Sequence, residues 1–142
     1  LIIGAGISGI EAALCLAHQG FKVYLVEKEP TVGGMLRKLY KLYPTGEDAS
    51  AFLDSAIRAV KANKNIDLHT STVIKDVKGY IGNFEVTALK DSKEEITFNV
   101  GTIIVATGAK EFKPTGMYGY GEQGKVVTQL ELERLLSMVS TG

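Results

Sequence analysis

Three glycines near the start of the chain stand at the spacing of a phosphate-binding turn. Gly4, Gly6 and Gly9 form a GxGxxG pattern between a short apolar run and a helix-forming stretch. Gly4 would permit the tight turn, Gly6 would let the backbone approach a pyrophosphate, and Gly9 would let the helix pack closely on the sheet. The first helical residues, Ile7 and Ser8, would turn free N–H groups and the positive end of the helix dipole toward the phosphates.

An acidic residue follows the next apolar strand. Residues 22–26 predict this strand, which ends at Glu27, and residues 10–26 leave room for a helix and a second strand after the glycines. A carboxylate at this place accepts hydrogen bonds from the ribose hydroxyls of an adenine nucleotide. We therefore predict that Glu27 binds the adenosine ribose, with Lys28 beside it.

A second pair of glycines, at positions 33 and 34, follows the acidic residue. The pair suggests a second backbone approach to the nucleotide, in which Gly34, Met35 and Leu36 lie nearest the ligand. The basic and aromatic segment 37–43 comes next. It is suited to contact a cofactor or a partner, and equally to be a solvated connector.

A later apolar strand, predicted over residues 102–106 and buried, ends in Ala106, Thr107 and Gly108. Ligands of open α/β sheets bind at the carboxyl ends of the strands. This strand end is therefore predicted to close over the nucleotide beside the first glycine turn.

The elements that must position these residues follow from hydrophobic periodicity. Helices are expected at about 7–19, 48–62 and from about 128 to 139, where Thr128 and Glu131 have the spacing of a capping box. Further strands are expected at 66–69, 72–78, 83–89 and 95–100, the last three as an antiparallel meander. The sequence thus predicts an α/β fold over residues 1–142: a Rossmann-like dinucleotide-binding domain, with a parallel sheet, helices and an antiparallel β-meander.

Composition narrows the function classes. The 142 residues include 16 basic and 16 acidic side chains, so overall charge gives no reason to expect nucleic acid as a partner. No apolar run approaches the length of a membrane span, and the single cysteine, Cys15, favours a cytoplasmic location. The chain starts inside a strand and without Met, which suggests a partial domain, an excerpt of a longer protein.

These motifs together resemble the FAD-binding domain of the two-dinucleotide-binding flavoprotein superfamily. A closer resemblance is to the A subunit of heterodisulfide reductase. It is carried by four segments, namely 23–30 (VYLVEKEP), 79–86 (GYIGNFEV), 118–121 (YGYG) and 126–136 (VVTQLELERLL).

The resemblance implies an FAD-binding redox domain whose complete protein holds iron–sulfur clusters and passes electrons between partner subunits of a complex. Ile74 is then expected to border the adenine. Relatives often carry cluster-ligating cysteines where residues 48–51 stand here, and a cysteine-rich insertion where residues 90–93 form only a turn. The second nucleotide domain and the downstream Gly-Asp segment are also absent from this sequence.

Two alternatives stay open on the residues. One is an NAD(P)-binding oxidoreductase domain, because Glu27 suits NAD equally well. The other is a non-enzymatic assembly module with a vestigial nucleotide site. Cys15 is interpreted as a packed thiol, and His18 and His69 as structural residues, so no catalytic residue and no metal ligand is assigned.

Overall fold

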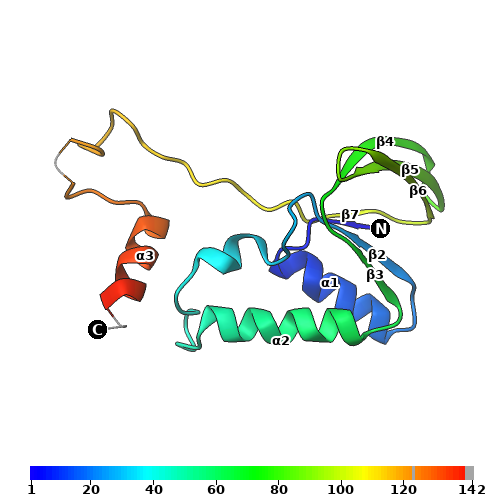
Figure 1. Cartoon of the computed structure of the whole chain (residues 1–142), viewed down its shortest axis with the longest axis horizontal. Helices are drawn as coiled ribbons and strands as arrows, with labels where there is room; N and C mark the ends of the chain where they lie inside the picture. Colours follow the sequence, from blue (N-terminus) through cyan, green and yellow to red (C-terminus); the bar gives the residue numbers. More distant parts are fainter. Residues whose placement is uncertain (123, 140–142) are drawn as a thin grey trace.

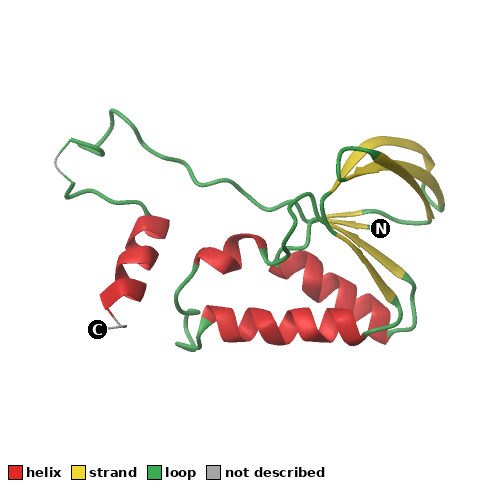
Figure 2. Ribbon diagram, viewed as in Figure 1, coloured by secondary structure: helices red, strands yellow, loops and turns green. Residues whose placement is uncertain are grey.

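A parallel sheet lies at the centre of the chain, and the computed structural model describes residues 1–122 and 124–139 around it. Its strand order is β3-β2-β1-β7. The strands are β1 (Ile2–Ile3), β2 (Val23–Val26), β3 (Ile66–His69) and β7 (Ile104–Val105). Helices cover one face and a second sheet covers the other, so the body has three layers (Figure 1 and Figure 2).

The helix layer consists of α1 (Ile7–His18), the short 3₁₀ helix η1 (Gly34–Lys38) and α2 (Ala49–Ala62). Small residues let α1 lie close to the sheet, since Ala13 and Ala17 are buried there. The Asp48 carboxylate caps α2 by accepting a hydrogen bond from the backbone N–H of Ala51 at 2.9 Å. Apolar residues of α1, η1, α2 and the sheet form the first hydrophobic core.

The antiparallel meander forms the third layer. Its strands are β4 (Thr72–Tyr80), β5 (Asn83–Lys90) and β6 (Glu94–Val100), paired in that order. Val86, Ala88 and Phe98 point from the meander to the parallel sheet and form a second core with Leu1 and Val26. The alternation of apolar and polar residues along β5 and β6 produces this one-sided burial.

The expected elements and the expected fold class are confirmed, with two corrections. The strand predicted over 102–106 has regular strand structure only at Ile104 and Val105, and Val105 is 70% exposed rather than buried. The reason is that β7 lies at the edge of the four-stranded sheet, with β1 as its only neighbour among the described residues. Cys15 is exposed on α1 instead of packed.

The last helix stands apart from the three layers. A long connector leaves β7 and leads to α3 (Gln129–Val139), which lies beside the η1 end of the body (Figure 1). One hydrogen bond between the two parts runs from the backbone N–H of Tyr40 to Glu133 Oε2, at 2.9 Å. None of the helix residues described is buried, and its apolar side chains are exposed except for that of Leu130, which is half-buried.

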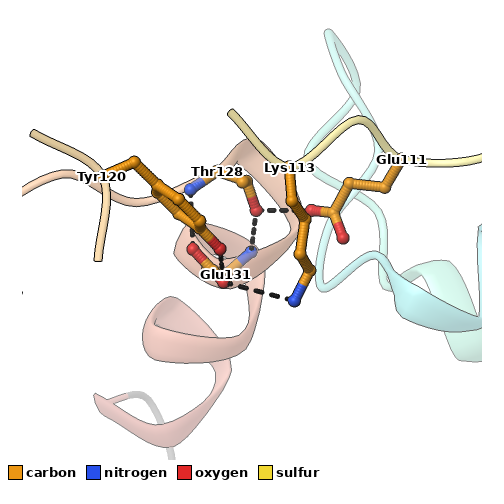
Figure 3. A network of polar contacts seen from close by, with 5 residues as sticks. All are labelled: Glu111, Lys113, Tyr120, Thr128 and Glu131. Carbon is orange, nitrogen blue, oxygen red and sulfur yellow. Dashed lines mark hydrogen bonds and ion pairs between the residues drawn. The ribbon is translucent and has the colours of Figure 1, made fainter. Parts of the chain in front are cut away.

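A polar network organises the connector at the start of α3 (Figure 3). Glu131 accepts hydrogen bonds from Tyr120 Oη at 2.6 Å and from the Thr128 backbone N–H at 2.8 Å, and it lies 3.6 Å from Lys113 Nζ. The Glu131 N–H returns a bond to Thr128 Oγ1 at 3.3 Å, so the predicted capping box is formed. Thr128 Oγ1 also donates to the Glu111 carboxylate. The network joins three separate segments of the connector.

We expect Glu131→Gln to loosen the connector without unfolding the body. The hydrogen bond from Tyr120, followed by that from the Thr128 N–H, lowers the pKa of Glu131 from its usual 4.5. Because the folded-state pKa is lowered, the contribution of Glu131 is fully present above that usual value and is lost as pH falls through the lowered pKa.

The measurement is hydrogen exchange of residues 111–128 at neutral and acidic pH. The protection factors, which correct for the intrinsic pH dependence of amide exchange, should fall in acid for the native chain. They should already be lower at neutral pH for Glu131→Gln, by about tenfold for one lost hydrogen bond. Glu122→Gln removes an exposed carboxylate of the same segment and serves as the control. Equal protection in Glu131→Gln and the native chain at neutral pH would contradict the assignment.

Candidate functional site

The turn between β1 and α1 is built on contacts that leave no room for side chains at two of its glycines. Gly4 has a φ of +103°, and a Cβ there would collide with the carbonyl of Ala106. A Cβ on Gly9 would collide with the Gly4 carbonyl oxygen and would lie 3.5 Å from the Ala106 Cβ. The roles expected of both glycines, the tight turn and the close helix–sheet packing, are therefore visible in the structure.

Gly6 differs from its two neighbours in the motif. It is the N-cap of α1 with φ −74° and ψ 179°, and a Cβ built there meets no atom within 4 Å. No side chain caps this end of the helix. Helix geometry leaves the N–H groups of Ile7, Ser8 and Gly9 without intrahelical acceptors. The outer side of the turn is thus open and lined by donors, which fits an anionic group.

The second pair of glycines lies directly against the first turn. Gly33 N–H donates to the Ala5 carbonyl at 2.7 Å, and Gly6 and Gly33 form an isolated parallel bridge. A Cβ on Gly34, which has a φ of +51°, would lie 3.2 Å from the Gly6 Cα. Two segments separated by more than twenty residues in sequence therefore form one continuous backbone surface.

Glu27 is placed beside this surface by β2. The residue is only 7% exposed. The carboxylate accepts hydrogen bonds from the backbone N–H groups of Ala5, at 2.8 Å, and Glu29, at 3.0 Å. The main chain of Glu27 is also held by hydrogen bonds: its N–H donates to the His69 carbonyl, and its carbonyl accepts from the Thr72 N–H.

The other predicted residues occupy three kinds of position. Ser8, Met35, Thr107 and Gly108 are exposed around the turn, and Ala106 lies within it through its N–H bond to the Ile3 carbonyl at 2.8 Å. Lys28 is exposed and lies 3.9 Å from Glu29. The side chain of Leu36 is buried in the first core, and that of Ile74 is half-buried against the second.

Ala5 escaped the sequence reasoning, and Gly33 was predicted only as a member of the glycine pair. Ala5 is fully buried between Gly4 and Gly6, and its N–H and carbonyl bond to Glu27 and Gly33. Gly33 has a φ of +115°, and a Cβ there would press on Leu53. The signal for Gly33 was the glycine pair itself. Ala5 carries none, because its contribution comes from its backbone.

One cavity lies away from the glycine turn, and no residue of the turn lines it. This cavity of about 490 Å³ lies between η1, the start of α2 and α3, and its lining includes Arg37, Glu133 and Arg134. Within residues 1–122 and 124–139, no cluster of three His, Cys, Asp or Glu side chains could hold a metal ion. No helix in the same part of the chain is long and apolar enough to cross a membrane.

Comparison with known proteins agrees with this geometry. Residues 1–138 match the family model described as pyridine nucleotide-disulphide oxidoreductase. An iron–sulfur A subunit of the CoB–CoM heterodisulfide reductase of Methanopyrus kandleri is 35% identical, covering 96% of this chain and 32% of its own length. A second such subunit of that organism is 45% identical over 86 residues, which cover 61% of this chain and 13% of its own.

Two further points concern length. This chain spans about one third of the curated relative that it matches over 96% of its residues. The alignment with that relative extends over 216 positions, against the 142 residues present here. The matched region of the relative therefore contains residues that have no counterpart in this chain.

Solved structures show the same fold. The L-proline dehydrogenase of P. horikoshii superposes with a TM-score of 0.67 at 27% identity, covering 75% of this chain and 22% of that one. The thioredoxin reductase of T. acidophilum gives a TM-score of 0.63 at 20% identity, covering 80% of this chain and 36% of that one. On the match over residues 1–138, the chain belongs to the pyridine nucleotide-disulphide oxidoreductase family and is a domain of an oxidoreductase.

Proposed function

We propose that this chain binds FAD through its adenosine and pyrophosphate half and serves as the flavin domain of a redox enzyme. The proposal rests on the empty space at the position of a Gly6 Cβ. The glycines on either side of it in the motif, Gly4 and Gly9, are required by the fold itself. Gly4 and Gly9 are explained by contacts within the protein, whereas the missing Cβ of Gly6 meets nothing. A pyrophosphate would account for that space.

The surrounding groups fit the same ligand. The uncapped N-terminus of α1 would receive the phosphates, the backbone of Gly34 would approach from the second loop, and Glu27 would accept from the ribose hydroxyls. Lys28 and Met35 are exposed beside these groups, and Ala106, Thr107 and Gly108 would form the closing edge. When bound, FAD supplies the redox chemistry, and the protein contributes position and electrostatics.

At the level of the whole protein, we propose an electron-transfer role with partner subunits. The support is that the relatives are named as A subunits of heterodisulfide reductases. Cys15 is the only cysteine in this sequence, so any iron–sulfur cluster of such a complex would be held outside it. A cytoplasmic location is proposed on the same resemblance.

The proposal predicts a specific loss of affinity on adding one methyl group at the turn. Gly6→Ala should keep the fold, because its backbone angles suit any residue and the Cβ meets no protein atom. It should weaken FAD binding by about tenfold or more, as expected for a misfit of about 1–3 kcal/mol. The measurement is titration with FAD followed by flavin fluorescence and calorimetry.

Gly101→Ala is the matched control, since its Cβ would make only ordinary contacts, the nearest at 3.7 Å, far from the turn. The control should bind FAD as the native chain does. A native chain that binds NADH but not FAD would support the NAD-binding alternative instead. If neither nucleotide binds, the vestigial-site alternative gains support and the proposed function fails.

A further inference from the structure

The carboxylate of Glu27 is engaged by the protein before any nucleotide arrives. Oε2 accepts from the Ala5 N–H at 2.8 Å in a buried bond, and Oε1 accepts from the Glu29 N–H at 3.0 Å. The ammonium of Lys28, the next residue in the sequence, lies 3.9 Å from the carboxylate of Glu29. Within the part of the chain that the structure describes, no ion pair to Glu27 is found. Its charge is balanced by backbone N–H dipoles.

The residue that Glu27 holds is the centre of the glycine turn. Ala5 lies between Gly4 and Gly6, its side chain is fully buried, and its carbonyl accepts from Gly33. The N–H of Ala5 is therefore fixed by Glu27 and its carbonyl by the second glycine loop. Hydrogen bonds to an ionised acceptor are roughly twice as strong as neutral ones. Glu27 is thus well placed to fix the shape of the turn.

We propose that Glu27 is a positioning residue for the pyrophosphate, acting through the Ala5 N–H, in addition to any contact with the ribose. The inference rests on the proposed function, since it concerns the same nucleotide site. A carboxylate offers about four acceptor positions, and the two backbone bonds leave positions free on each oxygen. Holding the turn and accepting from a ribose diol are therefore compatible.

The two roles of Glu27 separate when the ligand lacks the ribose hydroxyls. In Glu27→Gln the side chain offers one carbonyl oxygen and one NH₂ group, so one of the two N–H donors faces another donor. If Glu27 holds the turn, this change weakens binding of 2′,3′-dideoxy-ADP as well as of ADP. If it acts only on the ribose, the affinity for 2′,3′-dideoxy-ADP is unchanged.

The experiment is calorimetric titration of the native chain, Glu27→Gln and Glu29→Gln with ADP and with 2′,3′-dideoxy-ADP. We expect Glu27→Gln to lose about tenfold in affinity for 2′,3′-dideoxy-ADP, the effect of one charged hydrogen bond. Glu29→Gln changes an exposed neighbour and leaves its backbone donor in place, so it should match the native chain. Equal affinity of Glu27→Gln and the native chain for 2′,3′-dideoxy-ADP overturns the inference alone. Failure of the native chain to bind ADP overturns the proposed function.

A second variant covers the case in which Glu27→Gln does not fold. Replacing the Gly4–Ala5 amide by an ester removes the Ala5 N–H and leaves the carboxylate intact. It can be made by ligating a synthetic segment 1–14 to the remainder of the chain at Cys15, the single cysteine. The ester should also weaken 2′,3′-dideoxy-ADP binding by about tenfold. An ester chain with native affinity for this ligand overturns the inference.

Discussion

Gly9→Ala is expected to destabilise the chain by about 3 kcal/mol, although it adds a single methyl group. The new Cβ would collide with the carbonyl oxygen of Gly4, and neither atom can rotate away, because the Cβ is fixed directly to the backbone and the oxygen is part of it. Relief requires α1 to move away from β1, which would open the first core around Ile10 and Ala13. Natural domains are stable by only about 5–15 kcal/mol, so a large share of the stability would be lost.

The measurement is the free energy of unfolding in urea, followed by far-ultraviolet circular dichroism. Gly6→Ala is the control of choice, because it adds the same group three residues earlier, into open space. The two variants distinguish an effect on stability from an effect on binding. Gly9→Ala should lower the free energy of unfolding, whereas Gly6→Ala should lower only the affinity for the nucleotide. Equal unfolding midpoints for the two variants would show that the turn tolerates a side chain at position 9.

Phe98→Ala is expected to cost about 3–5 kcal/mol, the usual range for removing a buried phenylalanine ring. Phe98 is 3% exposed and points from β6 into the core between the meander and the parallel sheet. Its ring centroid lies 5.0 Å from that of Tyr24 on β2 and 5.0 Å from that of His69 on β3. The ring therefore joins the two sheets directly.

Hydrogen exchange of β4, β5 and β6 would show whether the loss is concentrated in the meander. Thr97→Ala alters the neighbouring residue on the exposed face of β6 and should change the free energy of unfolding by less than about 0.5 kcal/mol. A Phe98→Ala variant as stable as this control would mean that the second core contributes little. The nucleotide turn would then depend on the helix layer alone.

Hydrophobic periodicity and glycine spacing were sufficient for the fold class and for the order of elements, because both are local properties of the sequence. The strand at 66–69 was predicted with the bounds that the structure shows, and the Thr128–Glu131 capping box is formed as expected. The burial of individual residues was harder to predict from the sequence. Val105 looks like a core residue in sequence, but its exposure depends on which strand lies beyond it in the sheet.

Within the candidate site, residue types identified Gly4, Gly6, Gly9 and Glu27, since their chemistry lies in a missing or a charged side chain. Ala5 could not be found in this way. Its contribution is a backbone N–H and carbonyl, which every residue except proline carries, and only the fold brings them to Glu27 and Gly33. Contacts between segments distant in sequence are not encoded in any local pattern.

The alternation along the first strand sets how the chain tolerates changes of length. Leu1 belongs to the core beneath the meander, and Ile2 to the core beneath the helices. One residue inserted before Gly4 would exchange these faces or displace the turn, because side chains in a strand alternate with a period of two. The turn at Asp91 and Ser92, exposed and with positive φ, faces no such restriction. Lengthening of this domain is therefore expected at its hairpins, while the β1–turn–α1 unit keeps a fixed length.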